Sequence, residues 1–135
     1  MRLPVDAPAQ RSRERVLLVV DDDEMACRYA VRVLANAGFR VVAAHDGEEA
    51  KELLGELGSV IWPVVSDVQM PRMSGEELAD LVATRWPRLP VLLTSGQGHP
   101  PEGHTGPFLP KPYAPGALVS AVRALLPPSG CPACR

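Results

Sequence analysis

Short apolar runs alternate with helical patterns along the chain, and this alternation restricts the fold more than any other feature of the sequence. The run from Val16 to Val20 is five consecutive apolar residues, which is typical of a strand that is buried on both faces. Further strands are predicted at 40–44, within 60–66, at 91–95 and, in a shorter form, from 108. Strands that alternate with helices favour an α/β fold in which a doubly wound, five-stranded parallel sheet carries helices on both faces.

Glycine and proline residues separate the predicted helices. Helical spacings of apolar residues cover about 24–37, 47–57, 75–85 and 118–126. The first two patterns each stop at a glycine, the usual residue just beyond a helix. The segment 97–107 instead combines glycines, prolines and histidines. Because proline costs about 3 kcal/mol and glycine about 1 kcal/mol in a helix interior, we predict a loop there.

The composition is that of one globular domain. Hydrophobic residues make up 46% of the 135 residues and charged residues 22%, with a net charge of −2. We predict a domain over 16–126 between a loose tail at 1–15 and a flexible tail at 127–135. The scattered Lys and Arg residues form no basic face for nucleic acid, and no apolar run reaches the roughly 18 residues of a membrane span. The start lacks the apolar core of a signal peptide, so we expect a cytoplasmic protein.

Two of the three cysteines lie close together near the end of the chain. Cys131 and Cys134 have the spacing of half a zinc site or of a redox pair. The tail contains no further ligands, and no strand–helix unit surrounds the pair. We therefore assign no function to these two cysteines.

Polar side chains follow four of the predicted strands. The first strand leads to Asp21 and Asp22, the third to Asp67, the fourth to Ser95 and the fifth to Lys111. Because the carboxyl ends of parallel strands lie at one edge of the sheet, where such folds hold their ligands, we expect these side chains to gather there.

Each of these residues also has a simpler interpretation. Considered separately, Asp67 would only cap the next turn, Ser95 would only end a strand, and Lys111 would be a surface lysine. Acids at the start of a helix interact well with the helix dipole, and we assign that role to Asp23 and Glu24. The convergence of four strand ends is a stronger signal than any one residue.

A bound cation would relieve the repulsion between three neighbouring carboxylates. Each pair repels by about 1 kcal/mol even at the permittivity of water, and oxygen ligands of this kind suit Mg²⁺. A carboxylate that faces a hydroxyl and an ammonium beside such a metal is equipped to receive a phosphoryl group. The predicted product is an aspartyl phosphate.

Four segments of the chain resemble the receiver domain of two-component response regulators. They are 19–22 (VVDD), 66–75 (SDVQMPRMSG), 94–96 (TSG) and 108–113 (FLPKPY), and together they extend the resemblance over about 16–126. The last two segments are also similar to receivers attached to hybrid histidine kinases. The resemblance implies the flavodoxin-like strand order 2-1-3-4-5.

The resemblance also implies a set of roles. Asp67 is expected to accept a phosphoryl group from a phosphohistidine of a sensor or hybrid histidine kinase, or of a phosphotransfer protein. Asp21 and Asp22, with Asp67 and the backbone carbonyl of Gln69, are expected to hold Mg²⁺. Lys111 is expected to contact the phosphoryl group and to precede a cis peptide. The chain would thus be a signalling module, not an enzyme, apart from slow autodephosphorylation.

Two further residues are expected to form a switch. Ser95 is the preferred switch hydroxyl, with Thr94 as the alternative, and Phe108 fits the aromatic residue that turns inward, although it can equally be a plain core residue. The segment before Lys111 is shorter than usual by about one and a half helical turns, so the fourth helix is predicted to be short or missing. Because the family relays its signal through that surface, we expect a monomer or a weak dimer.

Two other functions share parts of this pattern. A flavin mononucleotide carrier would need a hydroxyl- and glycine-rich phosphate loop after the first strand, where Asp21, Asp22 and Asp23 would repel a phosphate. A receiver-like docking module that is never phosphorylated remains the main alternative. It is disfavoured because none of the site positions is missing.

Overall fold

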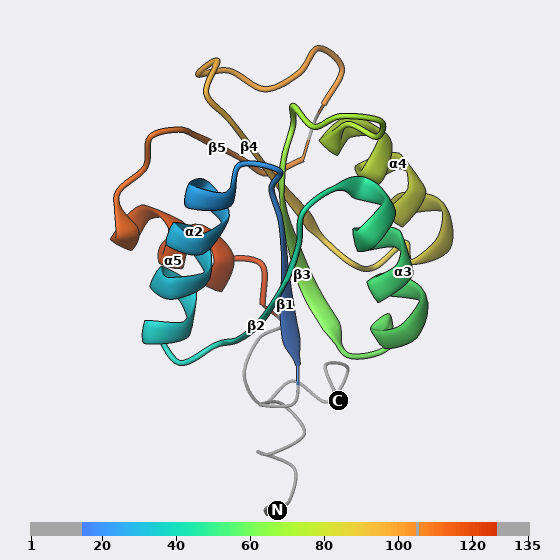
Figure 1. Ribbon diagram of the computed structural model, residues 1–135, viewed down its shortest axis with the longest axis horizontal. Helices are drawn as coiled ribbons and strands as arrows, with labels where there is room; N and C mark the ends of the chain where they lie inside the picture. The colour runs from blue at the N-terminus through green and yellow to red at the C-terminus, as the bar shows by residue number, and fades with distance from the viewer. Residues whose placement is uncertain (1–14, 105, 127–135) are drawn as a thin grey trace, which may run out of the picture.

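A computed structural model describes residues 15–104 and 106–126 of the chain, and it contains five strands and four helices (Figure 1). The predicted tails lie outside the described residues, apart from Arg15, as do Cys131 and Cys134. The elements in chain order are β1 (Val16–Val20), α2 (Glu24–Asn36), β2 (Arg40–Ala44), α3 (Gly47–Leu57), β3 (Ile61–Asp67), α4 (Gly75–Arg85), β4 (Val91–Ser95), β5 (Phe108–Pro110) and α5 (Pro115–Arg123).

The five strands form one parallel sheet in the order β2-β1-β3-β4-β5. This confirms the predicted fold class and the strand order that the resemblance implied. The order also makes β1 and β3 neighbours at the centre of the sheet, with Val20 opposite Ser66. The residues that follow β1 and those that end β3 are therefore brought side by side.

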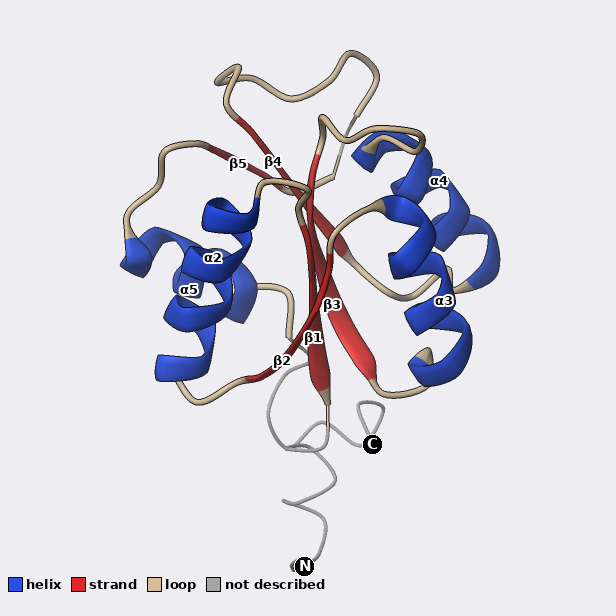
Figure 2. Ribbon diagram, viewed as in Figure 1, coloured by secondary structure: helices blue, strands red, loops and turns tan. Residues whose placement is uncertain are grey.

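Helices cover both faces of the sheet (Figure 2), with α2 and α5 on one face and α3 and α4 on the other. In β1, Leu17 and Val19 pack towards α2 and α5, whereas Leu18 and Val20 pack towards α3 and α4. Alternate side chains of a strand point to opposite faces, and both faces are buried here. This explains why the β1 segment is apolar at every position.

Pro63 is the third residue of β3 and lies inside the strand. The pairing between β1 and β3 shifts here, since Val16 pairs with Ile61 but Leu18 pairs with Val64. A bulge of this kind accommodates a residue that has no backbone N–H to donate. The Trp62–Pro63 peptide is cis.

The described residues between β4 and β5, 96–104 and 106–107, form turns and bends without a helix. This confirms the prediction that the helix between the fourth and fifth strands is short or missing. The last helix, α5, is shifted from its predicted range: it begins at Pro115, a residue that is well suited to the first turn of a helix, and ends at Arg123. Among the described residues, no helix has both the length and the apolar character needed to cross a bilayer.

Candidate functional site

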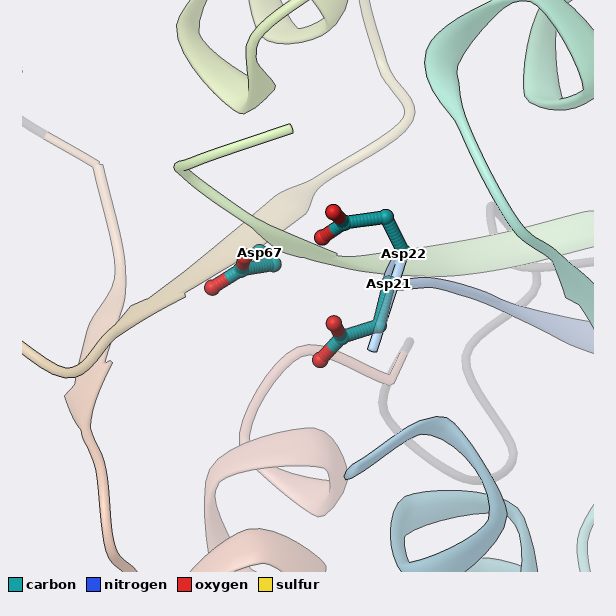
Figure 3. Close-up of side chains that lie close together, drawn as sticks. All are labelled: Asp21, Asp22 and Asp67. Atoms are coloured by element: carbon teal, nitrogen blue, oxygen red, sulfur yellow. The ribbon is translucent and has the colours of Figure 1, made fainter. Parts of the chain in front are cut away.

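Three carboxylates meet at the carboxyl edge of the sheet. Asp21 and Asp22 directly follow β1, and Asp67 is the last residue of β3 (Figure 3). One carboxylate oxygen from each residue lies within 4.8 Å of the others. Asp21 and Asp67 are buried, whereas Asp22 is exposed. The predicted gathering of the three acids is therefore present in the structure.

Lys111 contacts two of these acids. Its Nζ donates a hydrogen bond to Asp21 Oδ2 at 2.9 Å and lies 3.1 Å from Asp67 Oδ1. Its backbone N–H donates to the carbonyl oxygen of Ser95 at 2.8 Å, and the following peptide, to Pro112, is cis as the resemblance implied. The pairing of β5 with β4 thus carries the lysine to the acids.

The charges of these groups depend on each other. Burial is the largest influence on Asp67 and raises the pKa of its carboxyl, although the nearby Lys111 ammonium acts to lower it. Burial would lower the pKa of Lys111, but hydrogen bonds and charge interactions with Asp21 and Asp67 outweigh it and raise that pKa. Lys111 is consequently an ammonium ion at neutral pH, and one ammonium faces three acidic residues.

This donor set fits a hard divalent cation. All three side chains offer oxygen ligands, and a single ammonium leaves the cluster short of positive charge. Magnesium and calcium both bind to carboxylate, carbonyl and water oxygens. The acidic cluster is thus a group of residues that could hold a metal, in agreement with the prediction from the strand ends.

A tight loop connects Asp67 to α4. The Gly75 N–H donates to the carbonyl oxygen of Val68 at 2.8 Å, which closes the loop. A Cβ atom at position 75 would collide with the carbonyl oxygen of Asp67, so only glycine fits there. Ser74 then begins α4 as the N-cap of a capping box with Glu77.

A cleft of about 640 Å³ opens beside the acids and contains Asp22, Gln69 and Ser95 in its lining. The Ser95 hydroxyl oxygen accepts the N–H of Gln97 at 3.1 Å, so the hydroxyl hydrogen is not used in that bond. Thr94 is also buried and lies opposite Asp67 in the β3–β4 ladder, but it does not line the cleft. The position of Ser95 in the cleft favours it over Thr94 as the switch hydroxyl, a role that remains a prediction.

Phe108 is the first residue of β5 and is partly buried. It packs against the core between the sheet and the helices α3 and α4. This location is compatible with both interpretations given above, an inward-turning switch residue and a plain core residue.

Two features of the site were not foreseen from the sequence. The ring of Tyr113 contacts that of Tyr29 of α2 in a tilted arrangement with ring centroids 5.9 Å apart, and the Tyr29 hydroxyl donates to the Tyr113 carbonyl oxygen at 3.3 Å. Arg72, in the loop after β3, forms an ion pair with Asp46 at the start of α3. Both contacts join residues that are far apart in the sequence, and no local pattern signals them.

Comparison with known protein families gives a match over most of the chain. The family model of the response regulator receiver domain matches residues 17–123. Among curated proteins, the chain is 32% identical over 129 residues to the sensor kinase CckA of Brucella abortus, covering 90% of this chain and 14% of that protein. It is 34% identical over 116 residues to the response regulator MprA of Mycobacterium ulcerans, covering 82% of this chain and 49% of that protein. The chain thus spans half or less of the length of these relatives.

Solved structures agree with this match. The receiver domain of the hybrid histidine kinase CckA has a TM-score of 0.73 and 32% identity, with 83% of this chain and 99% of that chain covered. The chemotaxis response regulator CheY4 of Vibrio cholerae has a TM-score of 0.74 and 28% identity, with 83% and 98% covered.

Proposed function

This chain belongs to the family of response regulator receiver domains, and from that membership we propose that the edge of its sheet is the phosphorylation site of a two-component His–Asp relay. The proposal is carried by one observation: the carboxylates of Asp21, Asp22 and Asp67 lie together, with the Lys111 ammonium between two of them. In this function Asp67 is the phosphoacceptor.

In the proposed reaction, a carboxylate oxygen of Asp67 attacks the phosphorus of a phosphohistidine. The new oxygen–phosphorus bond forms while the phosphorus–nitrogen bond breaks, and the electron pair returns to the imidazole of the donor. Lys111, which already contacts Asp67, donates to the phosphoryl oxygens and stabilises the charge that gathers on them.

A bound Mg²⁺ would supply further charge neutralisation to the phosphoryl oxygens. Asp21, Asp22 and Asp67 would hold it, together with the backbone carbonyl of Gln69, a residue that lines the adjacent cleft. The oxygen-only donor set and the excess of negative charge support this choice of ion.

Phosphorylation would then act on a switch at the fourth and fifth strands. The hydroxyl of Ser95, which lines the cleft, would donate to the phosphoryl group. Phe108, only partly buried on the adjacent strand, would turn inward as Ser95 moves. The phosphoryl donor would be a sensor or hybrid histidine kinase, or a phosphotransfer protein, and the protein would act as a monomer or weak dimer.

Mass spectrometry tests the proposal directly. The full chain is incubated with acetyl phosphate, a small phosphoryl donor, in the presence of Mg²⁺. We expect a mass gain of one phosphoryl group, which is absent in Asp67→Asn and is also absent when EDTA replaces Mg²⁺. Asp80→Asn, which removes an exposed carboxylate of α4 outside the cluster, is the matched control and is expected to gain the group normally.

The opposite result would identify a different function. If neither acetyl phosphate nor the phosphorylated cognate kinase modifies the wild-type chain, the protein is a receiver-like docking module. A mass gain that persists in Asp67→Asn would instead move the phosphoacceptor to another residue.

A further inference from the structure

One ion pair connects the loop after β3 with the start of α3, outside the acidic cluster. The guanidinium of Arg72 contacts Asp46 Oδ2. The other oxygen of the same carboxylate, Oδ1, accepts the backbone N–H of Glu49 at 2.8 Å, so Asp46 is also the N-cap of α3. One carboxylate therefore fixes both the beginning of a helix and the neighbouring loop.

Arg72 has a backbone conformation that favours glycine. Its φ angle is +69°, and it is the only non-glycine residue with positive φ among the described residues. For an ordinary residue the left-handed conformation costs about 1–2 kcal/mol, and such conformations persist where the surrounding contacts hold them. The ion pair with Asp46 is a contact of that kind.

A second contact holds the same side of the loop. The start of α3 approaches Met73 so closely that a Cβ atom at Gly47 would lie 2.6 Å from the Met73 Cβ. Asp46 and Gly47 thus contact Arg72 and Met73 in the middle of the loop, while the hydrogen bond from Gly75 to Val68 joins the two ends of the loop. Gln69 lies between these two anchoring points.

We propose that Arg72 and Asp46 are positioning residues for the metal site, because their ion pair fixes the loop that presents the backbone carbonyl of Gln69. The inference rests on the proposed function, in which that carbonyl is a metal ligand. Without the pair, the middle of the loop would be held only by the contact between Gly47 and Met73, and the carbonyl would be less well aligned with the three carboxylates. Outer contacts that orient metal ligands typically contribute about 10- to 100-fold in affinity.

Removal of Arg72 separates positioning from simple charge effects. If only charge mattered, the loss of a cation near an acidic site would strengthen Mg²⁺ binding. If Arg72 positions the loop, its loss weakens binding. Glycine is the best replacement, because it removes the side chain and also relieves the left-handed backbone, so that Arg72→Gly is not expected to lower the free energy of unfolding.

The experiment is calorimetric titration of the full chain with MgCl₂. We expect Arg72→Gly and Asp46→Asn each to weaken Mg²⁺ binding by about tenfold, the low end of the effect of an outer contact. Asparagine is as good an N-cap as aspartate, so the second variant removes the charge while it retains the cap of α3. Arg72→Lys, which keeps a cation at the same position, is expected to bind Mg²⁺ nearly as well as the wild type.

The double variant completes the test. Because both residues act through one contact, Arg72→Gly with Asp46→Asn is expected to bind Mg²⁺ no more weakly than either single variant. Unchanged or tighter binding in Arg72→Gly, or fully additive losses in the double variant, would overturn the inference. A wild-type chain that takes up no Mg²⁺ would instead overturn the metal site itself, and this inference with it.

Discussion

At the scale of single residues, the site depends on which polar groups are withdrawn from water and which partners they meet. Asp21 and Asp67 are buried, and each forms an ion pair with the same lysine, Lys111. Asp22 stays exposed and has no such partner among the contacts described above. The buried acids are thus held by the lysine without a bound ligand, whereas Asp22 lines the adjacent cleft.

Tyr113 gives a prediction for alkaline pH. Burial, the largest cause, raises its pKa to about 12, from an ordinary value of 10.0. Because the folded state binds the phenolic proton more tightly, this contribution to stability is complete below pH 10 and is lost as the pH rises towards 12. We expect the free energy of unfolding of the wild type to fall more steeply across this window than that of Tyr113→Phe. Chemical denaturation at several pH values measures the difference, and identical slopes would contradict it.

At the scale of secondary-structure elements, the boundaries of the helices position the site. Asp23 caps α2 by accepting the N–H groups of Met25 and Ala26, immediately after the two acids that follow β1. Ser74 caps α4 immediately after the loop that follows Asp67. Sharp helix starts at these places limit the conformations that are open to the acids.

Two glycines on neighbouring helices allow a matched test of how the close approach at the start of α4 affects stability. Gly75→Ala would push a methyl group against the backbone of Asp67, and overpacking of this kind typically costs 1–3 kcal/mol. Gly55→Ala, within α3, meets nothing within 4 Å and is expected to gain about 0.5–1 kcal/mol of stability. Urea unfolding measures both changes. Equal effects of the two substitutions would show that the close approach at Gly75 has no energetic weight.

The sequence predicts the elements well and their tertiary contacts poorly. Apolar periodicity and terminal glycines locate the helices and strands because these signals are local, as in the third helix, whose predicted range of 75–85 matches α4. The acids and Lys111 could be predicted because each lies at the carboxyl end of a strand or directly after it, and a parallel sheet brings those ends to one edge. The Arg72–Asp46 pair and the Tyr29–Tyr113 contact depend on how loops and helices approach each other, which no local pattern encodes.

At the scale of the whole molecule, the segment between β4 and β5 bears on whether two copies of the chain could pair. The described part of this segment forms a wall of the cleft beside the acids, through Gln97, His99 and Glu102, and it offers no helical face. Isologous dimers need a self-complementary surface of substantial area, usually about 800 Å² on each partner. A loop rich in glycine and proline is a poor source of such a surface.

The oligomeric state is therefore a prediction for the phosphorylated protein. We expect the chain to remain monomeric, or to dimerise only weakly, after treatment with acetyl phosphate and Mg²⁺. Small-angle scattering and light scattering before and after treatment measure the change, with mass spectrometry of the same sample as the control for phosphorylation. A symmetric dimer that buries residues 97–107 on phosphorylation would contradict the expectation.

The ion pairs of Lys111 with Asp21 and Asp67 have a consequence for the protein when no metal is bound. The lysine is part of the chain, so the two buried acids, Asp21 and Asp67, have a counter-ion beside them that does not depend on a bound metal. Under the proposed function, a chain without Mg²⁺ would consequently keep the geometry of its buried acids but would not be phosphorylated. Under the proposed function, the reaction would still require Mg²⁺ and a phosphoryl donor, while Lys111 already holds the two buried acids.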